Sequence, residues 1–405
     1  MNAFFSIGMT FAFWASSVDS SGGNADGNIA IGDWGIPIFT PAEFYTFATK
    51  TDSVATDFYY LANDIDFSSF TWEYNALNNN VTFRGTLNGN GKTISNLTVT
   101  NNSTTYSYNG IFPRINGGTV YNITFDNVQI ITNLSGTTQR SGLVSGNASG
   151  STVTLDNITV INSGVQGNST NGVGGLIGNV QGATTILNIY NVKATNLKVF
   201  NDNAYVGGLV GRIATSGGRV NMYDIDFQGE VYSNLTGNTS SSYAGGLIGF
   251  VRSGAFFTLE RAIVEATFQN TLVTASNFLG YTNRYLGGFI GYNAAVSANV
   301  NLTNAFFTGS LYTRIDARRN DVGTVSGRDA TQATLSNVFH SFVAYRSTGG
   351  GINYTETTQT GQMATVVNPS AMPTVGWWDS AYAIFDAVNN LWAQDVVTGR
   401  LYLIR

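Results

Sequence analysis

The stretch Gly174-Gly175-Leu176-Ile177-Gly178 decides the fold, because the same phrase recurs along the chain. Close copies occupy 207–211, 245–249 and 287–291, and weaker copies occupy 109–112, 141–146 and 322–327. The second positions of the seven copies are 110, 142, 175, 208, 246, 288 and 323, so successive copies lie 32, 33, 33, 38, 42 and 35 residues apart. Seven copies near one period predict a repeat architecture rather than a series of separate globular domains.

A second position inside the period is marked by Asn or Asp in most copies. These residues follow their glycines by 12, 15, 16, 16, 16 and 14 residues: Asn122, Asn157, Asn191, Asp224, Asn304 and Asn337. The fifth copy has Arg261 at this position and breaks the pattern. Asn and Asp tolerate left-handed backbone angles and form turns, and alternating runs such as Ile123-Thr124-Phe125 follow them, as in half-buried strands. Each period therefore predicts about three short strands joined by turns.

The strands of one period cannot bury their apolar face alone, whereas stacked periods build a continuous core. The sequence therefore predicts an all-β fold, a right-handed parallel β-helix (solenoid) of about nine coils, which is about 40 Å long at about 4.8 Å per coil. A β-propeller is the alternative, although it requires a longer and more uniform period with four strands per blade. In each phrase two apolar residues stand side by side, as in Leu176-Ile177, and the pattern leaves open which of the two faces inward.

Both ends of such a solenoid need caps, because an open coil exposes a strand edge. Residues 40–50 (TPAEFYTFATK) predict a short N-terminal capping helix with Thr40 as N-cap, Pro41 at the first position and Glu43 at the third. Residues 363–405 leave the glycine-rich pattern and predict an aromatic C-terminal cap, with a partner-binding patch as the alternative. The aromatic residues gathered there are Trp377, Trp378, Phe385, Trp392 and Tyr402. The predicted organisation is a docking peptide and linker at 1–36, an N-terminal cap and first coils at 37–100, repeats at 101–350 and a C-terminal cap at 351–405.

Residues 3–15 (AFFSIGMTFAFWA) form a mostly apolar run that a Gly/Ser-rich linker at 20–27 separates from the repeats. The run is too short to span a bilayer and lacks the positive flank of a secretory signal. A signal peptide and a strand that packs on the protein's own core are the alternatives. We expect the run to dock by β-strand addition on another chain, either a different protein of the same assembly or a second copy of this one. The side chains expected to be buried there are Phe4, Phe5, Phe11, Phe13 and Trp14.

Composition excludes several classes of function. Cys is absent and His340 is the single histidine, which excludes a disulfide framework, a thiolate metal site and a multi-histidine metal site. The net charge of −5, from 19 basic and 24 acidic residues, disfavours a general nucleic-acid binder. We predict no metal, no cofactor and no membrane span, and we expect His340 to be an exposed or hydrogen-bonded strand residue.

Two pairs of carboxylates are the candidates for catalysis. Asp64 with Asp66, and Asp224 with Asp226, are spaced i,i+2 and would share one face of a strand. Glycoside hydrolysis needs two carboxyl groups at a set separation. Both pairs fall where the repeat places turns and strand starts, so we predict structural roles for them and no enzymatic activity.

A stripe of tyrosines is the candidate binding surface. Tyr205, Tyr243 and Tyr285 each stand three residues before the second glycine of their copy, and Tyr108 stands two before. Stacked coils would align them, either as a ladder that stabilises neighbouring coils or as a platform for a sugar ring or a partner, with Arg284 adding a polar contact. The longer steps of 38 and 42 residues place insertions before Tyr243 and Tyr285, and insertions in solenoids often cluster on the binding face.

The chain from about residue 38 to its end resembles the bacterial and phage surface β-helix proteins that carry the GLUG-type repeat. The resemblance lies in the Gly-Gly-Leu-Ile-Gly phrase and in the segments 38–44 (IFTPAEF), 58–66 (FYYLANDID), 83–97 (FRGTLNGNGKTISNL), 377–379 (WWD), 391–392 (LW) and 399–403 (GRLYL). Members of this family serve as adhesins, surface-layer components and virion fibres or spikes. The cellular members usually carry a clear signal peptide and an anchoring module, which the sequence pattern here does not show.

The resemblance therefore implies a non-enzymatic structural protein of the virion surface: a phage tail fibre, a spike or a capsid decoration used in assembly or host attachment. The implied partners are other virion or surface proteins, bound through the N-terminal segment, and a host-surface glycan. A secreted bacterial adhesin or surface-layer subunit, extracellular and at the cell surface, is the alternative. A polysaccharide-acting β-helix enzyme is the third.

Overall fold

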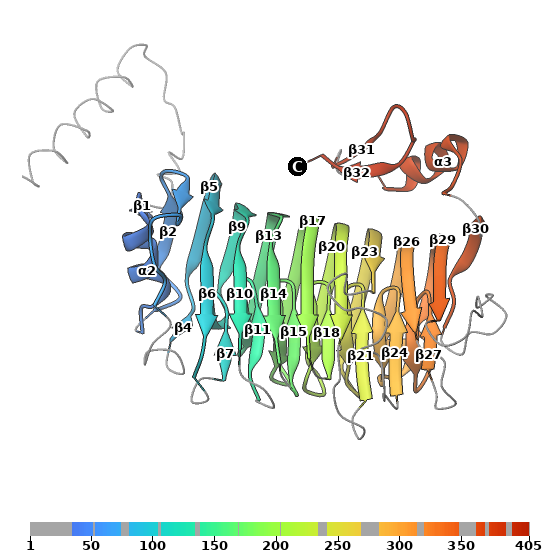
Figure 1. The fold of residues 1–405 in the computed structure, drawn as a ribbon, viewed down its shortest axis with the longest axis horizontal. Helices are drawn as coiled ribbons and strands as arrows, with labels where there is room; N and C mark the ends of the chain where they lie inside the picture. The colour runs from blue at the N-terminus through green and yellow to red at the C-terminus, as the bar shows by residue number, and fades with distance from the viewer. Residues whose placement is uncertain are drawn as a thin grey trace, which may run out of the picture. The chain divides into compact units, whose positions relative to one another are not determined.

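Each repeat folds into three strands that join three parallel sheets, as the computed structural model shows (Figure 1). The structure describes residues 35–51, 53–73, 81–103, 107–133, 138–168, 170–202, 204–233, 241–268, 283–313, 320–347, 362–368, 372–385 and 391–404. Residues 1–34 lie outside the described residues. The expected docking residues Phe4, Phe5, Phe11, Phe13 and Trp14 lie there.

The longest of the three sheets receives one strand from every coil. Its main path is β1 (Ile36–Ile38), β2 (Phe58–Leu61), β5 (Thr86–Ser95), β9 (Thr119–Asp126), β13 (Thr152–Ile161), β17 (Ile186–Asn201), β20 (Arg219–Ser233), β23 (Phe256–Thr267), β26 (Val300–Thr313), β29 (Thr334–Ser347) and β30 (Thr365–Asn368). Shorter strands extend it sideways: β3 (Ile65–Asp66), β6 (Thr98–Asn101), β10 (Gln129–Thr132) and β14 (Gly164–Gly167).

In each coil, the strand that leads into the glycine-rich phrase belongs to a seven-stranded sheet, and the strand that follows it belongs to an eight-stranded sheet. The seven-stranded sheet contains β7 (Tyr108–Asn109), β11 (Arg140–Gly142), β15 (Gly172–Gly174), β18 (Tyr205–Gly207), β21 (Ser241–Gly245), β24 (Asn283–Gly287) and β27 (Asn320–Gly323). The eight-stranded sheet contains β4 (Thr82–Phe83), β8 (Phe112–Asn116), β12 (Ser145–Ser149), β16 (Ile177–Gln181), β19 (Val210–Ile213), β22 (Ile248–Val251), β25 (Ile290–Asn293) and β28 (Ser326–Asp329). A short 3-10 helix, Ser297–Asn299, precedes β26.

The predicted right-handed parallel β-helix is confirmed, but the expected number of about nine coils is too high. The seven-stranded sheet has the fewest strands of the three, so it sets the number of complete coils among the described residues. Six full turns separate its first strand from its last. The ends account for the difference. There, β1, β2, β4 and β30 add strands to one or two of the sheets without completing a coil.

The recurrent phrase forms the corner between the seven-stranded and eight-stranded sheets, and both of its apolar residues face inward. β15 ends at Gly174 and β16 starts at Ile177, so the chain bends between them and the inside–outside alternation of a strand is interrupted. Leu176 and Ile177 are accordingly both fully buried. The backbones approach closely here: a Cβ atom on Gly178 would lie 2.6 Å from the carbonyl oxygen of Gly146. This close contact requires glycine.

The Asn positions form left-handed corners in the long sheet. Residues at this position have φ between +52° and +58°: Asn122, Asn157, Asn191, Asp224, Arg261, Asn304 and Asn337. Their side chains bond from coil to coil, as when Asn157 Nδ2 donates to Asn122 Oδ1 at 2.6 Å. A second row with φ between +50° and +57°, which the sequence analysis did not identify, contains Asn96, Asn127, Asn162 and Asn196. In this row, Asn127 Nδ2 donates to Asn96 Oδ1 at 2.8 Å.

The N-terminal capping helix is confirmed as α2 (Pro41–Ala48). Thr40 Oγ1 accepts a hydrogen bond from the Glu43 backbone N–H at 3.3 Å, and Glu43 Oε2 accepts one from the Thr40 N–H at 3.2 Å. This reciprocal capping box, with Pro41 at the first helical position, fixes where the helix starts. The ring of Phe47 packs on Phe83 and Phe112 of the first coils at centroid distances of 5.6 and 5.5 Å.

The aromatic C-terminal segment packs along the side of the long sheet. It contains α3 (Val375–Phe385) and an antiparallel pair, β31 (Trp392–Gln394) and β32 (Leu401–Leu403). Ile263 of β23 and Phe306 of β26 point away from the main core. The residue after each of them, Val264 and Phe307, belongs to that core, and successive side chains of a strand point to opposite faces. These outward apolar side chains need cover, and the segment supplies it with Trp378, Phe385 and Trp392.

Candidate functional site

Two rows of side chains run from coil to coil beside the glycine corner. In the eight-stranded sheet, successive register partners are Arg114, Asn147, Asn179, Arg212, Phe250, Tyr292 and Arg328. In the seven-stranded sheet, Arg140 pairs with Tyr108, and a separate run of partners continues through Gly172, Tyr205, Tyr243 and Tyr285. We call the aromatic and arginine members of both rows the aromatic–arginine stripe. They are Tyr108, Arg114, Arg140, Tyr205, Arg212, Tyr243, Phe250, Tyr285, Tyr292 and Arg328.

The aromatic half of the stripe is a continuous stack. The ring centroids of Tyr205, Tyr243 and Tyr285 follow one another at 5.0 Å, with interplanar angles of 13° and 14°. Phe250 lies 4.9 Å from Tyr205, and Tyr292 lies 5.4 Å from Tyr243. Tyr285 is buried, whereas the other four rings are half-buried and reach the surface. The structure thus brings three of the predicted tyrosines together and aligns two further rings with them.

The arginine half lies toward the N-terminal coils. The guanidinium carbons of Arg140 and Arg114 lie 5.0 and 5.4 Å from the Tyr108 ring centroid, and that of Arg212 lies 5.2 Å from Tyr205. These are cation–π contacts. Burial lowers the pKa of Arg140 and of Arg212, and Arg212 also feels the positive charges of Arg140 and Arg252.

None of the ion pairs among the described residues involves Arg114, Arg140 or Arg212. In each of the three, the Nε atom is buried without a hydrogen-bond partner. These three guanidinium groups therefore have no carboxylate partner in the part of the chain that the structure describes.

Two predicted members of the binding surface need separate comment. Tyr108 lies in the N-terminal coils, outside the tyrosine stack, where arginines replace its aromatic neighbours. Arg284 belongs to β24, but its side chain lies outside the described part of the chain, as do the insertions at 234–240 and 269–282.

The row in the eight-stranded sheet was not predicted from the sequence, although the sequence carries a signal for it. Arg212, Phe250, Tyr292 and Arg328 each follow directly after the last glycine of their phrase.

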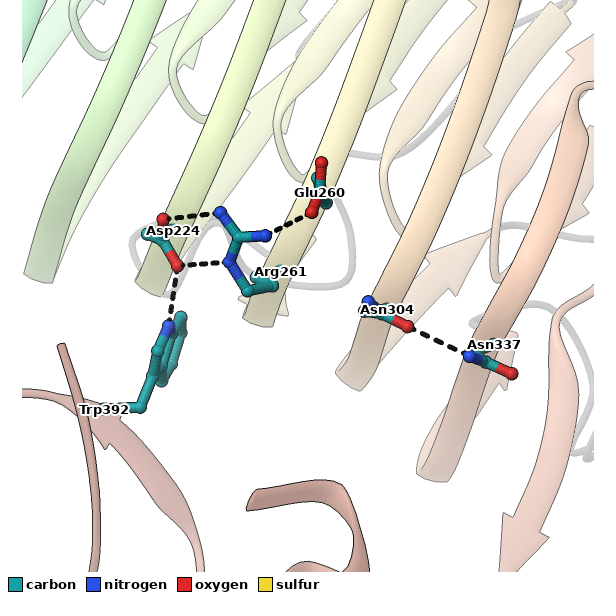
Figure 2. A network of polar contacts seen from close by, with 6 residues as sticks. All are labelled: Asp224, Glu260, Arg261, Asn304, Asn337 and Trp392. Atoms are coloured by element: carbon teal, nitrogen blue, oxygen red, sulfur yellow. Dashed lines mark hydrogen bonds and ion pairs between the residues drawn. The ribbon is translucent and has the colours of Figure 1, made fainter. Parts of the chain in front are cut away.

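The carboxylates considered for catalysis bind protein groups instead. Asp224 accepts two hydrogen bonds from Arg261, at 2.8 and 3.0 Å, and one from Trp392 Nε1 at 2.8 Å (Figure 2). Arg261 also pairs with Glu260, and the hydrogen bond to Asp224 raises the pKa of the Arg261 guanidinium. Asp226 accepts from Arg400 at 3.2 Å and from the Leu403 N–H at 3.2 Å. Both aspartates therefore hold the C-terminal segment against the coils.

The N-terminal pair of carboxylates stabilises turns. Asp64 Oδ1 accepts from the Thr93 N–H at 2.8 Å. Asp66 accepts from Asn96 and from the Ser68 N–H, both at 2.9 Å, and the bond from Asn96 is the main cause that lowers its pKa. These bonds link the first coils.

A groove of about 360 Å³ on the outer side of the long sheet is a second candidate surface. Phe200 and Tyr232 stack in its wall at 5.4 Å, and Lys198 pairs with Glu230 at 3.2 Å. Because this lysine is already paired with a carboxylate, the groove offers less to a charged ligand than the arginine half of the stripe does.

The described ranges contain no group of three His, Cys, Asp or Glu side chains placed to hold a metal ion. Within them, no helix has the length and apolarity needed to cross a bilayer.

Comparisons with known proteins agree with the fold. No family model and no curated protein matches the chain. A solved structure described as "a putative immunoglobulin A1 protease from Bacteroides ovatus" is similar over 91% of this chain and 92% of its own, with a TM-score of 0.55 and 16% identity. A second, named "IgA1 Protease", is 15% identical, with a TM-score of 0.40. The match spans 83% of this chain and 25% of that one. At such identity the first likeness shows the fold alone, so the chain is a parallel β-helix protein. The resemblance to the GLUG-type repeat stays a prediction.

Proposed function

We propose that this chain is a non-enzymatic attachment protein of a virion surface, a fibre, spike or capsid decoration whose β-helix presents the aromatic–arginine stripe to a host-surface glycan. The observation that carries the proposal is the stack of Tyr205, Tyr243 and Tyr285 at 5.0 Å beside Arg212, which forms no ion pair with any described residue. A stack that served stability alone would need the rings but not this charge.

The scaffold suits this role because it fixes the spacing of the stripe. Backbone bonds of parallel strands hold each ring at the level of its coil, so little side-chain freedom is lost when a ligand binds. The rims of Tyr205, Tyr243, Phe250 and Tyr292 are half-buried and remain open to a sugar ring.

Attachment to the assembly is assigned to the N-terminal segment, residues 1–36. Residues 35–405 form a compact unit, so we expect this part of the chain to fold without residues 1–20. Deleting residues 1–20 should leave a folded β-helix that no longer joins its assembly, whether the partner is another virion protein or a second copy of this chain. Normal incorporation of the truncated protein would contradict the docking role.

The location and the glycan-binding role have separate tests. Gold-labelled antibody against residues 35–405, imaged by electron microscopy on native material, should mark virions. Labelling of the bacterial surface would favour the alternative, a secreted adhesin or surface-layer subunit. Purified protein should also adsorb to host cells and compete with particle attachment. Variants Tyr205→Ala and Tyr243→Ala should reduce adsorption at least threefold while the protein remains folded by circular dichroism.

The name of the Bacteroides ovatus protein makes proteolysis the second candidate function. His340, the single histidine, is 1% exposed inside β29 and its pKa is lowered to about 4 by burial. A buried imidazole of this kind does not suit a serine-type triad, whose base must reach substrate. Incubation with human IgA1 followed by gel electrophoresis tests this candidate. The non-enzymatic proposal predicts no cleavage beyond that by a matched blank.

A further inference from the structure

We infer that the groove at Phe200, on the outer side of the long sheet, is a second binding site that takes an uncharged polysaccharide strand along the axis of the solenoid. The groove has a volume of about 360 Å³ and is lined by residues of β10, β14, β17 and β20. These strands belong to the long sheet, whereas the stripe belongs to the two other sheets. The inference therefore goes beyond the proposed function and uses other residues than those of the stripe.

Two rows of register partners form the floor of the groove and give it an elongated shape. One row contains Gln129, Gly164, Lys198 and Glu230, and the other contains Ile131, Gln166, Phe200 and Tyr232. Each row crosses four coils at about 4.8 Å per coil, so the floor is about 14 Å long. A chain-like ligand that follows the coils matches this shape better than a compact one.

The floor continues toward the N-terminal cap. Thr98 and Thr100 of β6 are the register partners of Gln129 and Ile131. They line a second hollow, of about 690 Å³, into which the half-buried ring of Phe70 also faces. A strand that extends beyond the groove at Phe200 therefore meets further hydroxyl groups and another aromatic ring.

The groove combines an aromatic surface with paired polar groups. Phe200 is half-buried and stacks on Tyr232 at 5.4 Å, with an interplanar angle of 12°. Beside this ring, the Lys198 ammonium pairs with the Glu230 carboxylate at 3.2 Å, so donors and acceptors lie next to each other. The exposed amide of Gln166 adds one group of each kind. A sugar is the complement, because it has an apolar ring face and hydroxyl groups that both donate and accept.

The same residues disfavour a charged ligand and a peptide. Lys198 and Glu230 are the charged members of the described lining, and they neutralise each other, so an anion meets no unpaired cation there. A peptide could add to the sheet only at a free strand edge. However, β10 lies between β6 and β14, and β14 lies between β10 and β17. The groove therefore suits an uncharged chain that is rich in hydroxyl groups.

Native affinity electrophoresis of the full chain tests the ligand class. The gels contain one of four uncharged polysaccharides (dextran, glucomannan, arabinoxylan or hydroxyethylcellulose) or the acidic polygalacturonate. We expect at least one uncharged polysaccharide to retard the protein, and polygalacturonate not to. Isothermal titration calorimetry with a hexasaccharide of the retarding polymer should give at least tenfold tighter binding than with its monosaccharide. This affinity should not change as NaCl is raised from 50 to 300 mM, because no charge is involved.

Two variants with matched controls locate the site. Phe200→Ala should weaken binding at least tenfold. Tyr190→Ala is its control, because Tyr190 lies in the same strand and also stacks on a ring of β20, Tyr223 at 5.4 Å, but does not line the groove. Gln166→Arg places a longer side chain on the floor and should weaken binding without disturbing the core. Its control is Thr195→Arg, at another exposed position of the long sheet. Both controls should bind like the wild type.

The outcomes separate this site from the stripe. Binding that is lost in Tyr205→Ala or Tyr243→Ala but kept in Phe200→Ala and Gln166→Arg would overturn the groove and leave the proposed function intact. Preference for polygalacturonate, or affinity that falls with salt, would overturn the uncharged class. If none of the uncharged polysaccharides retards the protein, the inference is wrong. Self-association in analytical ultracentrifugation that Gln166→Arg abolishes would instead assign the groove to a second copy of this chain.

Discussion

Trp392 Nε1 donates a hydrogen bond of 2.8 Å to Oδ1 of Asp224, although the two residues lie 168 positions apart in the chain. Asp224 occupies the left-handed corner at which most of the other coils have Asn, and Arg261 occupies the same corner one coil later. In those coils the corner side chains bond to the preceding coil, as Asn157 does to Asn122, Asn337 to Asn304 and Asn191 to Asp156. Here the corner is charged because it also receives the C-terminal segment (Figure 2).

Replacement of Trp392 by Phe should weaken the docking of the C-terminal segment by about 1–3 kcal/mol, since a buried carboxylate oxygen loses a donor. Limited proteolysis should then cut within residues 386–404 at a lower concentration of protease, and urea unfolding should begin earlier. Trp378→Phe is the matched control, because Trp378 packs in the same cluster without a bond to Asp224. Equal protease sensitivity of the two variants would show that ring packing, not the hydrogen bond, holds the segment.

Arg261→Asn should destabilise the protein by about 3–5 kcal/mol, because it leaves the buried Asp224 carboxylate without its bidentate partner. The double variant Asp224→Asn with Arg261→Asn should recover most of this loss, since two amides can bond as Asn157 and Asn122 do. Urea unfolding of both single variants and of the double variant gives the coupling energy. If the double variant is no more stable than Arg261→Asn, the corner row does not tolerate restoration of Asn.

The period of the sequence predicts the coils because it reports local turn chemistry. Gly at the tight corner and Asn at a left-handed corner are required by backbone geometry that each coil repeats. The second Asn row could have been found as well, since Asn127, Asn162 and Asn196 each stand five residues after an Asn already identified. In β20 this row ends, because Gly229 pairs with Leu197 across a register shift.

Long-range pairing is what the sequence could not predict. The break at Arg261 is visible in the repeat, but its cause, the contact of Asp224 with Trp392, depends on how the C-terminal segment returns to the coils. The stripe was predicted only in part for a similar reason. The rings of Phe250 and Tyr292 meet the tyrosines across the corner, and a one-dimensional period does not show which sheets face each other there.

Two substitutions at Asn157 separate the backbone contribution of the corner from its hydrogen bond. Asn157 has φ +52° and donates to Asn122 at 2.6 Å. Asn157→Gly keeps the left-handed conformation and loses the bond, so we expect about 1 kcal/mol of destabilisation. Asn157→Ala loses the same bond but keeps a Cβ in that conformation, so it should cost about 1–2 kcal/mol more than Asn157→Gly. Thermal and urea unfolding measure both, and equal losses would show that the left-handed backbone carries no penalty here.

Leu176→Ala and Ile177→Ala should each cost about 2–5 kcal/mol, because both side chains are fully buried at the corner. Val296→Ala is the surface control, since Val296 is 53% exposed, and it should change the free energy of unfolding by less than about 0.5 kcal/mol. Urea unfolding provides the comparison. A near-neutral result for either corner residue would mean that only one of the pair fills the core.

The stability of the protein should fall as the pH is lowered from about 6.5 to about 4, because of His340. Burial in β29 lowers the pKa of this residue from 6.5 to about 4, so the folded imidazole stays neutral in that range while the unfolded one takes up a proton. The unfolded state therefore binds more protons, and the full effect is about 3 kcal/mol.

The measurement is the free energy of unfolding by urea at several pH values between 3.5 and 7.5, for the wild type and for His340→Leu. Asp329, whose pKa is raised by burial, acts on stability in the opposite sense but is present in both proteins, so their difference isolates the histidine. We expect this difference to shift in favour of His340→Leu as the pH decreases and to level off below about pH 4, where the folded histidine also protonates. A difference that does not change with pH would mean that the imidazole reaches water in the folded protein.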